Sequence, residues 1–424
     1  MPTAHWQHTA LALAAALLTG TAAQAASGIQ LQFETISGPT ITGRSTVKGY
    51  ERSIDATSFQ WGVGVGISSG TNGERNASTP SVSDITWTQA YDTSYNRLNN
   101  AMFSGGRYDS TFSFVADGAA NQPKQSYLTM RTGVSAISSL NISSGGDRPS
   151  MSASEGFRSF SLSYDPAKLG KSGSAVSVGY DGVENRVTGQ TNRAGSHRVG
   201  GAAASGLYLR LGGLGGGGSG SGSIAIAGDS TDRGYENWIK LSSFQWGVGV
   251  GLAPDGAGFQ QSVPSISELT VTQVFDGAVP VILSNLLRGR SIGRATLEYV
   301  QGGTSGSVTA MQLELDDVIF SGLSMSSSGE LPSVSQSLNF RGYTQTIWAI
   351  KPDGTRGDAD VFSYDLLTRE VRGNATATAA ASIDGFGAGM LAPLAAPPIP
   401  EPQTWALMAG GLALLGLLRR RRPA

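Results

Sequence analysis

The sequence predicts a mainly β protein built from two tandem β-barrel domains, each with one α-helix. Three observations support this class. Glycine occurs 59 times in 424 residues, about twice its average usage, while apolar residues still make up 39% of the chain and can fill packed cores. Apolar residues recur mainly with the period of two that is typical of strands. A long stretch of the sequence also occurs twice.

The repeat is clearest at residues 58–66 (SFQWGVGVG), which recur unchanged as residues 243–251, at an offset of 185 positions. Similar residues continue upstream and downstream of both segments. We therefore place one domain at 28–189 and the other at 207–373, with a linker at 190–206. A period this long indicates tandem domains, because the repeats of solenoids are much shorter.

Alternating apolar residues predict about eight short strands in each copy, which suits a closed or nearly closed barrel. In both SFQWGVGVG segments bulky apolar side chains alternate with glycine and glutamine, so each segment should turn one apolar face to the core. We expect Trp61 and Trp246 to pack there. The alternative for these tryptophans is a platform on which a sugar stacks. Glycine on the opposite face allows close approach of a neighbouring strand.

One segment of each copy has a helical pattern instead. Residues 276–289 (DGAVPVILSNLLRG) place Pro280 in a first helical turn, space their apolar residues three and four apart, and end at Gly289. Residues 92–103 are the weaker equivalent in the first copy, with Gly105 beyond. Each copy is therefore expected to carry one helix.

The N-terminus has the features of a secretory signal peptide at residues 1–25. A short apolar run at 10–18 precedes the small-x-small site formed by Ala23 and Ala25, so cleavage is expected after Ala25. The apolar run is too short to span a bilayer. The chain is therefore expected to be exported.

The C-terminus carries a second targeting segment, at residues 399–424, after an Ala/Gly/Pro-rich linker at 374–398. Pro400, Glu401 and Pro402 precede an apolar helix at 405–418, and four cations follow it: Arg419, Arg420, Arg421 and Arg422. This order closely resembles the PEP-CTERM sorting signal, which implies transient recognition by an exosortase, a membrane transpeptidase. Before processing the helix would hold the chain in the membrane. An ordinary C-terminal membrane anchor is the alternative.

A family resemblance covers both copies. The strand at 207–211, the Ser-Phe-Gln-Trp-Gly-Val segment, the helix ending at Gly289 and residues 361–365 occur in an order that resembles the haemolysin-coregulated proteins (Hcp), which form the tube of type VI secretion systems. The resemblance implies a β-barrel flanked by one helix, and six-membered rings that can stack. Unlike tube proteins, this chain has an export signal, two copies and a sorting tail. The neighbourhood of the stacking loop holds glycine and serine at 212–223.

Formation of a ring is therefore a better-supported expectation than stacking of rings into a tube. Because each chain supplies two barrels, three chains could close one ring as a pseudo-sixfold trimer. A monomer with two barrels tethered like beads is the alternative.

Composition and motifs exclude several classes of function. A net charge of -1 with 14% charged residues offers no basic surface for nucleic acid. The chain has no cysteine, hence no disulfide, thiolate nucleophile or cysteine-bound metal. His197 is the single histidine outside the signal peptide and lies in the linker, so a catalytic triad is disfavoured. Carboxylates at Asp229/Asp232 and at 314–317 are interpreted as solvated turns, with calcium as the alternative.

The sequence thus favours an exported, non-enzymatic structural or interaction protein without cofactor or metal, sorted to the cell envelope, cell surface or extracellular matrix of a Gram-negative bacterium. The alternative is a secreted module that binds polysaccharide or another ligand. Exposed aromatic residues on one barrel face, unmatched between the two copies, would favour that alternative. A hydrolytic enzyme is the weakest hypothesis.

Overall fold

The fold is taken from a computed structural model, which describes residues 26–373 with gaps at 70–74, 117–123, 147, 190–201, 213–225, 256–257, 304–305 and 330. The predicted signal peptide, most of the linker, His197, nearly all of the 212–223 loop and everything from residue 374 onward lie outside the described residues. Both copies of the repeat are described over most of their length.

Six antiparallel strands of the first copy pair in a closed circuit, which is the expected barrel. In order around the circuit they are β1 (Ala26–Ser37), β2 (Ile54–Gly64), β6 (Ile85–Ala90), β9 (Ser150–Gly156), β8 (Gln125–Ser143) and β7 (Arg107–Ala116), which returns to β1. Outside this circuit, β8 also pairs with β10 (Ser159–Tyr164), followed by β11 (Val176–Asp181) and β12 (Arg186–Thr188).

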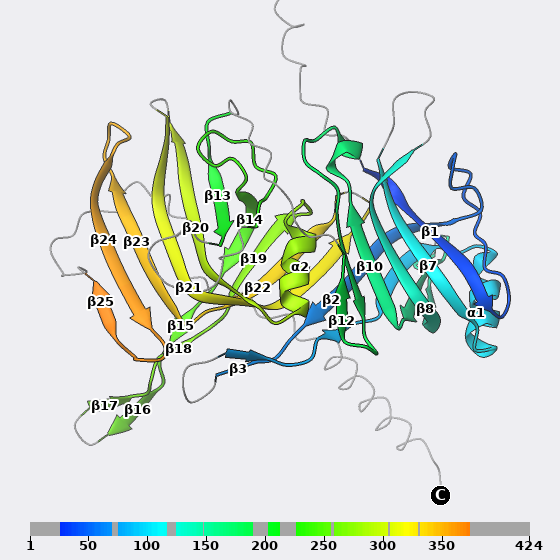
Figure 1. The fold of residues 1–424 in the computed structure, drawn as a ribbon, viewed down its shortest axis with the longest axis horizontal. Helices are drawn as coiled ribbons and strands as arrows, with labels where there is room; N and C mark the ends of the chain where they lie inside the picture. Colours follow the sequence, from blue (N-terminus) through cyan, green and yellow to red (C-terminus); the bar gives the residue numbers. More distant parts are fainter. Residues whose placement is uncertain are drawn as a thin grey trace, which may run out of the picture.

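The second copy repeats this topology (Figure 1). Its circuit consists of β13 (Gly206–Leu211), β14 (Ile239–Gln245), β19 (Leu269–Val274), β22 (Ser333–Asn339), β21 (Gly306–Ser327) and β20 (Ser291–Gly303). The extension from β21 consists of β23 (Gly342–Ile350), β24 (Arg356–Asp365) and β25 (Val371–Gly373). The strand registers therefore define equivalent residues in the two copies.

Two strands are much longer than the short strands expected from the sequence: β8 has 19 residues and β21 has 22. The first half of each strand pairs with the extension on one edge and with a barrel strand on the other, and the second half pairs with the next barrel strand around the circuit. Each strand bends between its two halves. The bend is marked by a residue in the left-handed region, Val134 with φ 52° and its equivalent Asp317 with φ 51°. Apolar periodicity alone does not reveal a strand that changes partner midway.

Short strands complete each copy. In the first copy, β3 (Ile67–Ser69) and β4 (Arg75–Ala77) form a hairpin, and β5 (Ser81–Val82) pairs with β2. A 3-10 turn spans Pro166–Leu169. In the second copy, β16 (Leu252–Asp255) and β17 (Gly258–Gln261) form the equivalent hairpin, and β15 (Val248–Gly249) pairs with β18 (Ser265–Ile266).

Both expected helices are present, as α1 (Ser94–Phe103) and α2 (Val279–Leu287). An aspartate precedes each helix and accepts a hydrogen bond from a backbone N–H at the start of the helix: Ser94 N donates to Asp92 at 2.8 Å, and Ala278 N, just before α2, donates to Asp276 at 3.0 Å. Gly105 and Gly289 follow the helices with positive φ angles of 67° and 58°, a conformation that favours glycine. The helical predictions are confirmed.

One hydrophobic cluster runs through both copies, so the chain is not two beads on a tether. In the first copy, Phe59 packs edge-on against Phe112 and Phe114, with ring centroids 5.3 and 5.2 Å apart. The core prediction is confirmed for Trp61, which is fully buried. It is confirmed only in part for Trp246, which packs against the core and lies 4.7 Å from the Tyr343 ring but stays partly exposed, because its strand segment lies at an open end of the molecule.

Candidate assembly interface

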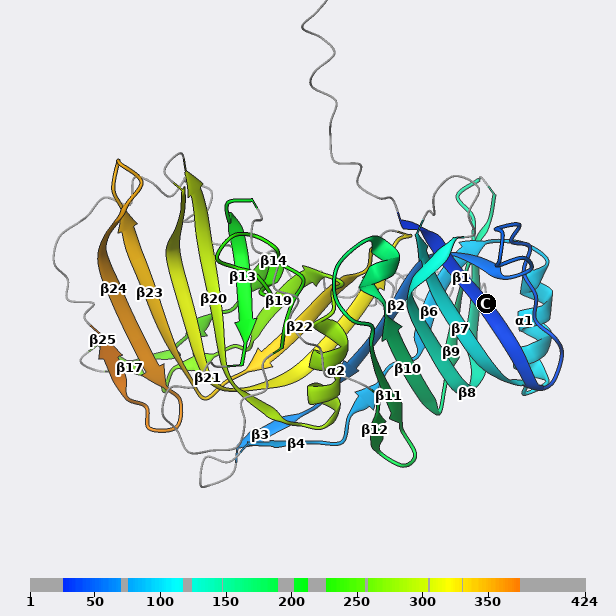
Figure 2. The ribbon, with the colours of Figure 1, turned by 45° about the horizontal axis from the view of Figure 1, so that its top comes forward.

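The two copies are joined by a strand pair that continues one sheet from the first barrel into the second (Figure 2). β2 pairs antiparallel with the end of β21, from Phe59 opposite Ser327 to Gly64 opposite Gly322. Just beyond, Val65 N donates to Ser321 O at 2.9 Å. Each strand thus pairs on both edges, once within its own barrel and once across the junction.

Side chains at this junction are withdrawn from water. Trp61 stands opposite Met325, and both are 1% exposed. Val63 stands opposite Leu323, and both are buried. Gly62 lies between them, and a Cβ added there would come within 3.2 Å of Leu323 O. The alternation of glycine with bulky residues therefore allows the close approach that the sequence indicated.

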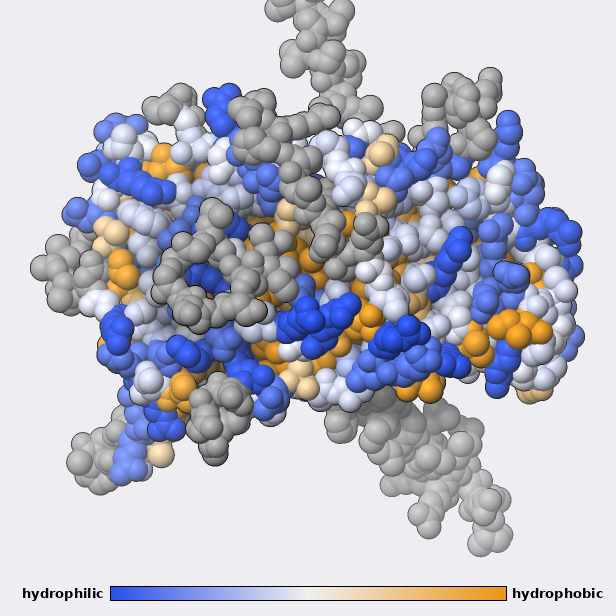
Figure 3. Space-filling view, in the orientation of Figure 1, coloured by the Kyte–Doolittle hydropathy of each residue, from blue (hydrophilic) through white to orange (hydrophobic). Residues whose placement is uncertain are grey.

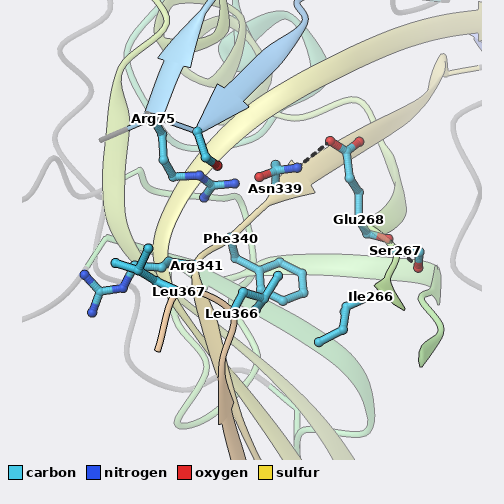
Figure 4. A pocket seen from close by; sticks show the side chains of 10 residues that line it. Arg75, Ile266, Ser267, Glu268, Asn339, Phe340, Arg341, Leu366 and Leu367 are labelled. Atoms are coloured by element: carbon cyan, nitrogen blue, oxygen red, sulfur yellow. Dashed lines mark hydrogen bonds between the residues drawn. The ribbon is translucent and has the colours of Figure 1, made fainter. Parts of the chain in front are cut away.

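The β3/β4 hairpin of the first copy reaches over the second copy and forms one wall of a cleft (Figure 4). Arg75 Nη1 donates to the backbone oxygen of Asp317 at 2.7 Å. Burial lowers the pKa of the Arg75 guanidinium, and the charges of Asp317 and Glu268 oppose that change. Glu268 accepts hydrogen bonds from Asn339 at 2.9 Å and Ser321 at 2.6 Å. The hairpin is thus docked on polar groups that are already positioned.

Helix α2 belongs to the second copy but also packs against β10 and β11 of the first, and every residue of it is buried. At its start, Tyr164 packs against Phe275 with ring centroids 5.2 Å apart, and the Tyr164 hydroxyl bonds Asp229 at 3.2 Å. At its end, Arg288 Nη2 donates to Val187 O at 3.4 Å. In Figure 3 apolar residues gather in the middle of the face, beside the position that α2 has in Figure 1. The helix is therefore a buried, mainly apolar element packed between the two copies.

The same elements recur at the two outer ends of the molecule, where they are exposed. Residues 244–249 are equivalent to the junction part of β2, and among the described residues no strand pairs with their outer edge. Residues 139–143 of β8 are equivalent to the junction part of β21, and the described part of the chain again places no strand on the outer edge. Ile142 is 45% exposed, although its equivalent Met325 is almost fully buried. Each end therefore carries one half of the junction.

The sequence-predicted site residues lie elsewhere or outside the described residues. Ala23, Ala25, Pro400–Pro402 and Arg419–Arg422 belong to the terminal segments that the structure does not describe. The acidic groups considered for calcium have protein partners: Lys240 bonds Asp232 at 2.8 Å, and Arg294 bonds Asp316 at 3.1 Å. Within residues 26–373, outside the stated gaps, no group of side chains has a metal-binding arrangement, and no helix has the length and apolarity to cross a membrane.

Sequence reasoning missed a buried acid, Glu155, inside the first barrel. Its carboxyl group accepts hydrogen bonds from Ser110 at 2.8 Å and Thr132 at 3.0 Å. Burial raises the pKa of Glu155 to about 7, although these hydroxyls oppose the rise. The equivalent residue of the second copy is Leu338, as the strand registers show. A comparison of the two copies position by position would have revealed the difference.

Comparison with known families matches each copy of the repeat separately. The family described as "Type VI secretion system effector, Hcp" matches residues 32–169 and, a second time, residues 208–347. The PEP-CTERM protein-sorting motif matches residues 398–422. No curated protein matches the chain.

Several solved structures are similar to one copy of the repeat. A type six secretion system protein is 19% identical, with 40% of this chain and 100% of that chain covered and a TM-score of 0.35. Hcp1 from Salmonella typhimurium is 18% identical, with 39% and 98% covered and a TM-score of 0.31. A type VI secretion system effector from Yersinia pestis is 19% identical, with 38% and 98% covered and a TM-score of 0.28.

The fold and the junction define a mainly β protein in which two barrels pair edge to edge within one chain. The two Hcp matches together cover more than half of the chain. The chain therefore belongs to the Hcp family, as a tandem member that also carries a PEP-CTERM sorting motif.

Proposed function

We propose that this protein is an exported, non-enzymatic structural protein whose chains associate head to tail through the same contacts that join its two copies. One observation carries the proposal. The junction has two halves, and each half is repeated, exposed, at the opposite outer end of the chain. A contact between unlike surfaces of identical chains propagates until it closes into a ring or continues as a filament.

Closure by three chains would give a ring of six barrels, the pseudo-sixfold trimer. Each chain contributes one internal junction and one junction to its neighbour, so a closed trimer has six junctions of one geometry. The exposed halves of the junction support this arrangement over an isolated chain, because exposed strand edges are otherwise open to unspecific pairing.

Export and sorting are proposed from the two terminal signals. Cleavage after Ala25 would release the chain from the export machinery. An exosortase would then recognise Pro400-Glu401-Pro402 while the apolar helix and Arg419–Arg422 hold the tail in the membrane. The match of the sorting motif to residues 398–422 supports this route to the cell surface or extracellular matrix.

The alternative, a secreted polysaccharide-binding module, would need exposed aromatic residues in one copy without counterparts in the other. The partly buried Trp246 and Phe244 instead correspond to Trp61 and Phe59, which are both 1% exposed, and Trp61 stands opposite Met325 of the second copy. Protein, rather than sugar, already covers this surface once in the chain. The aromatic surface of the second copy thus favours assembly.

The test uses the mature protein recovered from outside the cells. Intact-mass analysis should lack residues 1–25 and the arginine cluster, and recovery of the full-length tail outside the cells would contradict exosortase processing. Light scattering at micromolar concentration should give the mass of three chains. A mass of one chain across the accessible concentrations would rule out the head-to-tail assembly.

A further inference from the structure

We infer that the contact between chains is a polar version of the apolar contact within the chain, with Arg97 of one chain opposite Asp360 of the next. This inference rests on the proposed head-to-tail assembly and specifies its chemistry. It follows from comparing, position by position, the residues that α2 and its neighbours bury at the junction with their equivalents at the two outer ends.

Helix α1 shows which face of α2 is turned to the other copy. In α1 the buried residues, Leu98 and Ala101, face its own barrel. The exposed residues Asn96, Arg97 and Asn100 are equivalent to Pro280, Val281 and Ser284 of α2, which are buried. Helix α2 differs from α1 in packing on β10 and β11 of the other copy. The outer face of the helix is therefore apolar at the junction and polar at the end of the chain.

The strand surface on which the helix packs also differs between the two copies: it is apolar at the junction and more polar at the outer end. At the junction, α2 lies on β10 and β11, where Leu162 and Val176 are buried. The strand registers make Gln345 and Asp360 their equivalents in the second copy, and Asp360 is exposed. Polar residues thus replace apolar ones on both sides of the same contact.

The positions in the helix fix the expected partners. Phe275 and Tyr164, at the start of α2, and Arg288 and Val187, at its end, show that the helix runs along β11 from Val176 towards Tyr180. Val281, in the first turn of α2, therefore lies at the Val176 end. In a second copy of the contact, its equivalent Arg97 comes to the end of β24 that holds Asp360, with charges of opposite sign.

The borders of the contact remain apolar on both sides. Phe103, 82% exposed at the end of α1, is equivalent to the buried Leu287. Val371, 61% exposed on β25, is equivalent to Val187 near the end of α2. At the other border, exposed Tyr91 and Ile347 are equivalent to Phe275 and Tyr164, the pair that is packed at the junction. A second chain would bury all four of these side chains.

A physical reason accounts for the polar centre. A contact within one chain forms once, during folding, and can be fully apolar. A surface that contacts a second chain is exposed until assembly, and the chain must stay soluble in that state. Large exposed apolar patches and open strand edges would promote its aggregation. Polar groups that match in charge keep the isolated end soluble and still select the correct partner.

Charge reversal tests the inference by light scattering of the mature protein over a concentration series. Arg97→Glu and Asp360→Arg should each weaken association by about tenfold or more, since each places like charges opposite one another. The double variant should associate nearly as the native protein does. Added salt should weaken native association, because exposed charge pairs are screened. Arg131→Glu, an equal charge change on a strand with both edges paired, should leave association unchanged.

A second variant separates this inference from the assembly itself. Val248→Asp places a charge on the exposed edge of the second copy and should block association whatever the helix contact contains. If Val248→Asp blocks assembly while both charge reversals assemble like the native protein, the polar contact is overturned and the head-to-tail assembly stands. If the native chain remains a monomer at all concentrations, both proposals fail. Arg97 also donates to Thr42 O at 3.3 Å, so thermal unfolding of each variant controls for folding.

Discussion

The two SFQWGVGVG segments have the same nine residues and different structures. In the first copy β2 runs without a break to Gly64, and Val63 is 5% exposed. In the second copy β14 ends at Gln245, a two-residue strand follows at Val248–Gly249, and Val248 is 51% exposed. The difference lies in the partner, because only the first segment has β21 on its outer edge.

This pair of segments separates what local sequence specifies from what the neighbour adds. Alternation determines which side chains share a face, and it does so equally in both copies. A second ladder of hydrogen bonds and the burial of that face come only with the neighbouring strand, so strand length and exposure follow the partner. Edge segments of identical sequence are thus regular where they are paired and broken where they are exposed.

The largest difference between the two segments is expected when the tryptophan of each is removed. Trp61→Ala removes a fully buried ring from a junction and should lower the free energy of unfolding by roughly 3 to 5 kcal/mol. Trp246→Ala removes a ring that is partly buried and packs on Tyr343, and should cost less, about 2 kcal/mol, since the penalty scales with the buried area. Denaturant unfolding of dilute, unassembled protein measures both. Equal losses would mean that the second copy is covered in solution as well.

The buried acid of the first barrel gives the next largest expected effect. Glu155 has a pKa of about 7 in the folded chain against an ordinary value of 4.5, so the folded state holds its proton more tightly than the unfolded state does. The contribution of Glu155 to stability is therefore fully present below about pH 4.5 and is lost as the pH rises to about 7, by about 3 kcal/mol in all.

Glu155→Gln keeps the size of the side chain and removes the titration. The variant should be more stable than the native protein at pH 8 and should lose the decrease between pH 4.5 and 7 that this group causes. Denaturant unfolding at a series of pH values measures the change, with exposed Glu34→Gln as the control. An unchanged pH profile would show that Glu155 is ionised and hydrated in the folded barrel.

Much of the fold was predictable because it depends on local sequence patterns. The repeat, the alternating strands and the helix from Val279, with proline in its first turn and glycine beyond its end, all follow from neighbouring residues. The junction could not be predicted, since pairing of β2 with β21 depends on residues about 260 positions apart that no periodicity connects. The full burial of Trp61, the partial burial of Trp246 and the burial of Glu155 follow from that three-dimensional arrangement.

The smallest expected effect concerns the hairpin that crosses the junction. Arg75→Met removes the hydrogen bond to Asp317 O and keeps an apolar side chain of similar length. The loss should be about 1 kcal/mol, at the lower end for a charged donor, because Arg75 is partly exposed and its pKa is already lowered by burial. Arg131→Met serves as the control for the loss of one cation.

Amide hydrogen exchange can distinguish a local effect of Arg75 on its hairpin from an effect on the whole molecule. Ser78 N donates to Gly66 O at 2.8 Å at the base of the β3/β4 hairpin, and Ser262 N donates to Gly251 O at 2.8 Å at the base of the equivalent hairpin in the second copy. Arg75→Met should speed exchange at Ser78 and leave Ser262 unchanged, since only the first hairpin is held by the other copy. Equal acceleration at both amides would mean that Arg75 stabilises the whole molecule and not the docking of its hairpin. If neither amide changes, the hairpin is held by its backbone and by the contact of Ala77 with Gly289 alone.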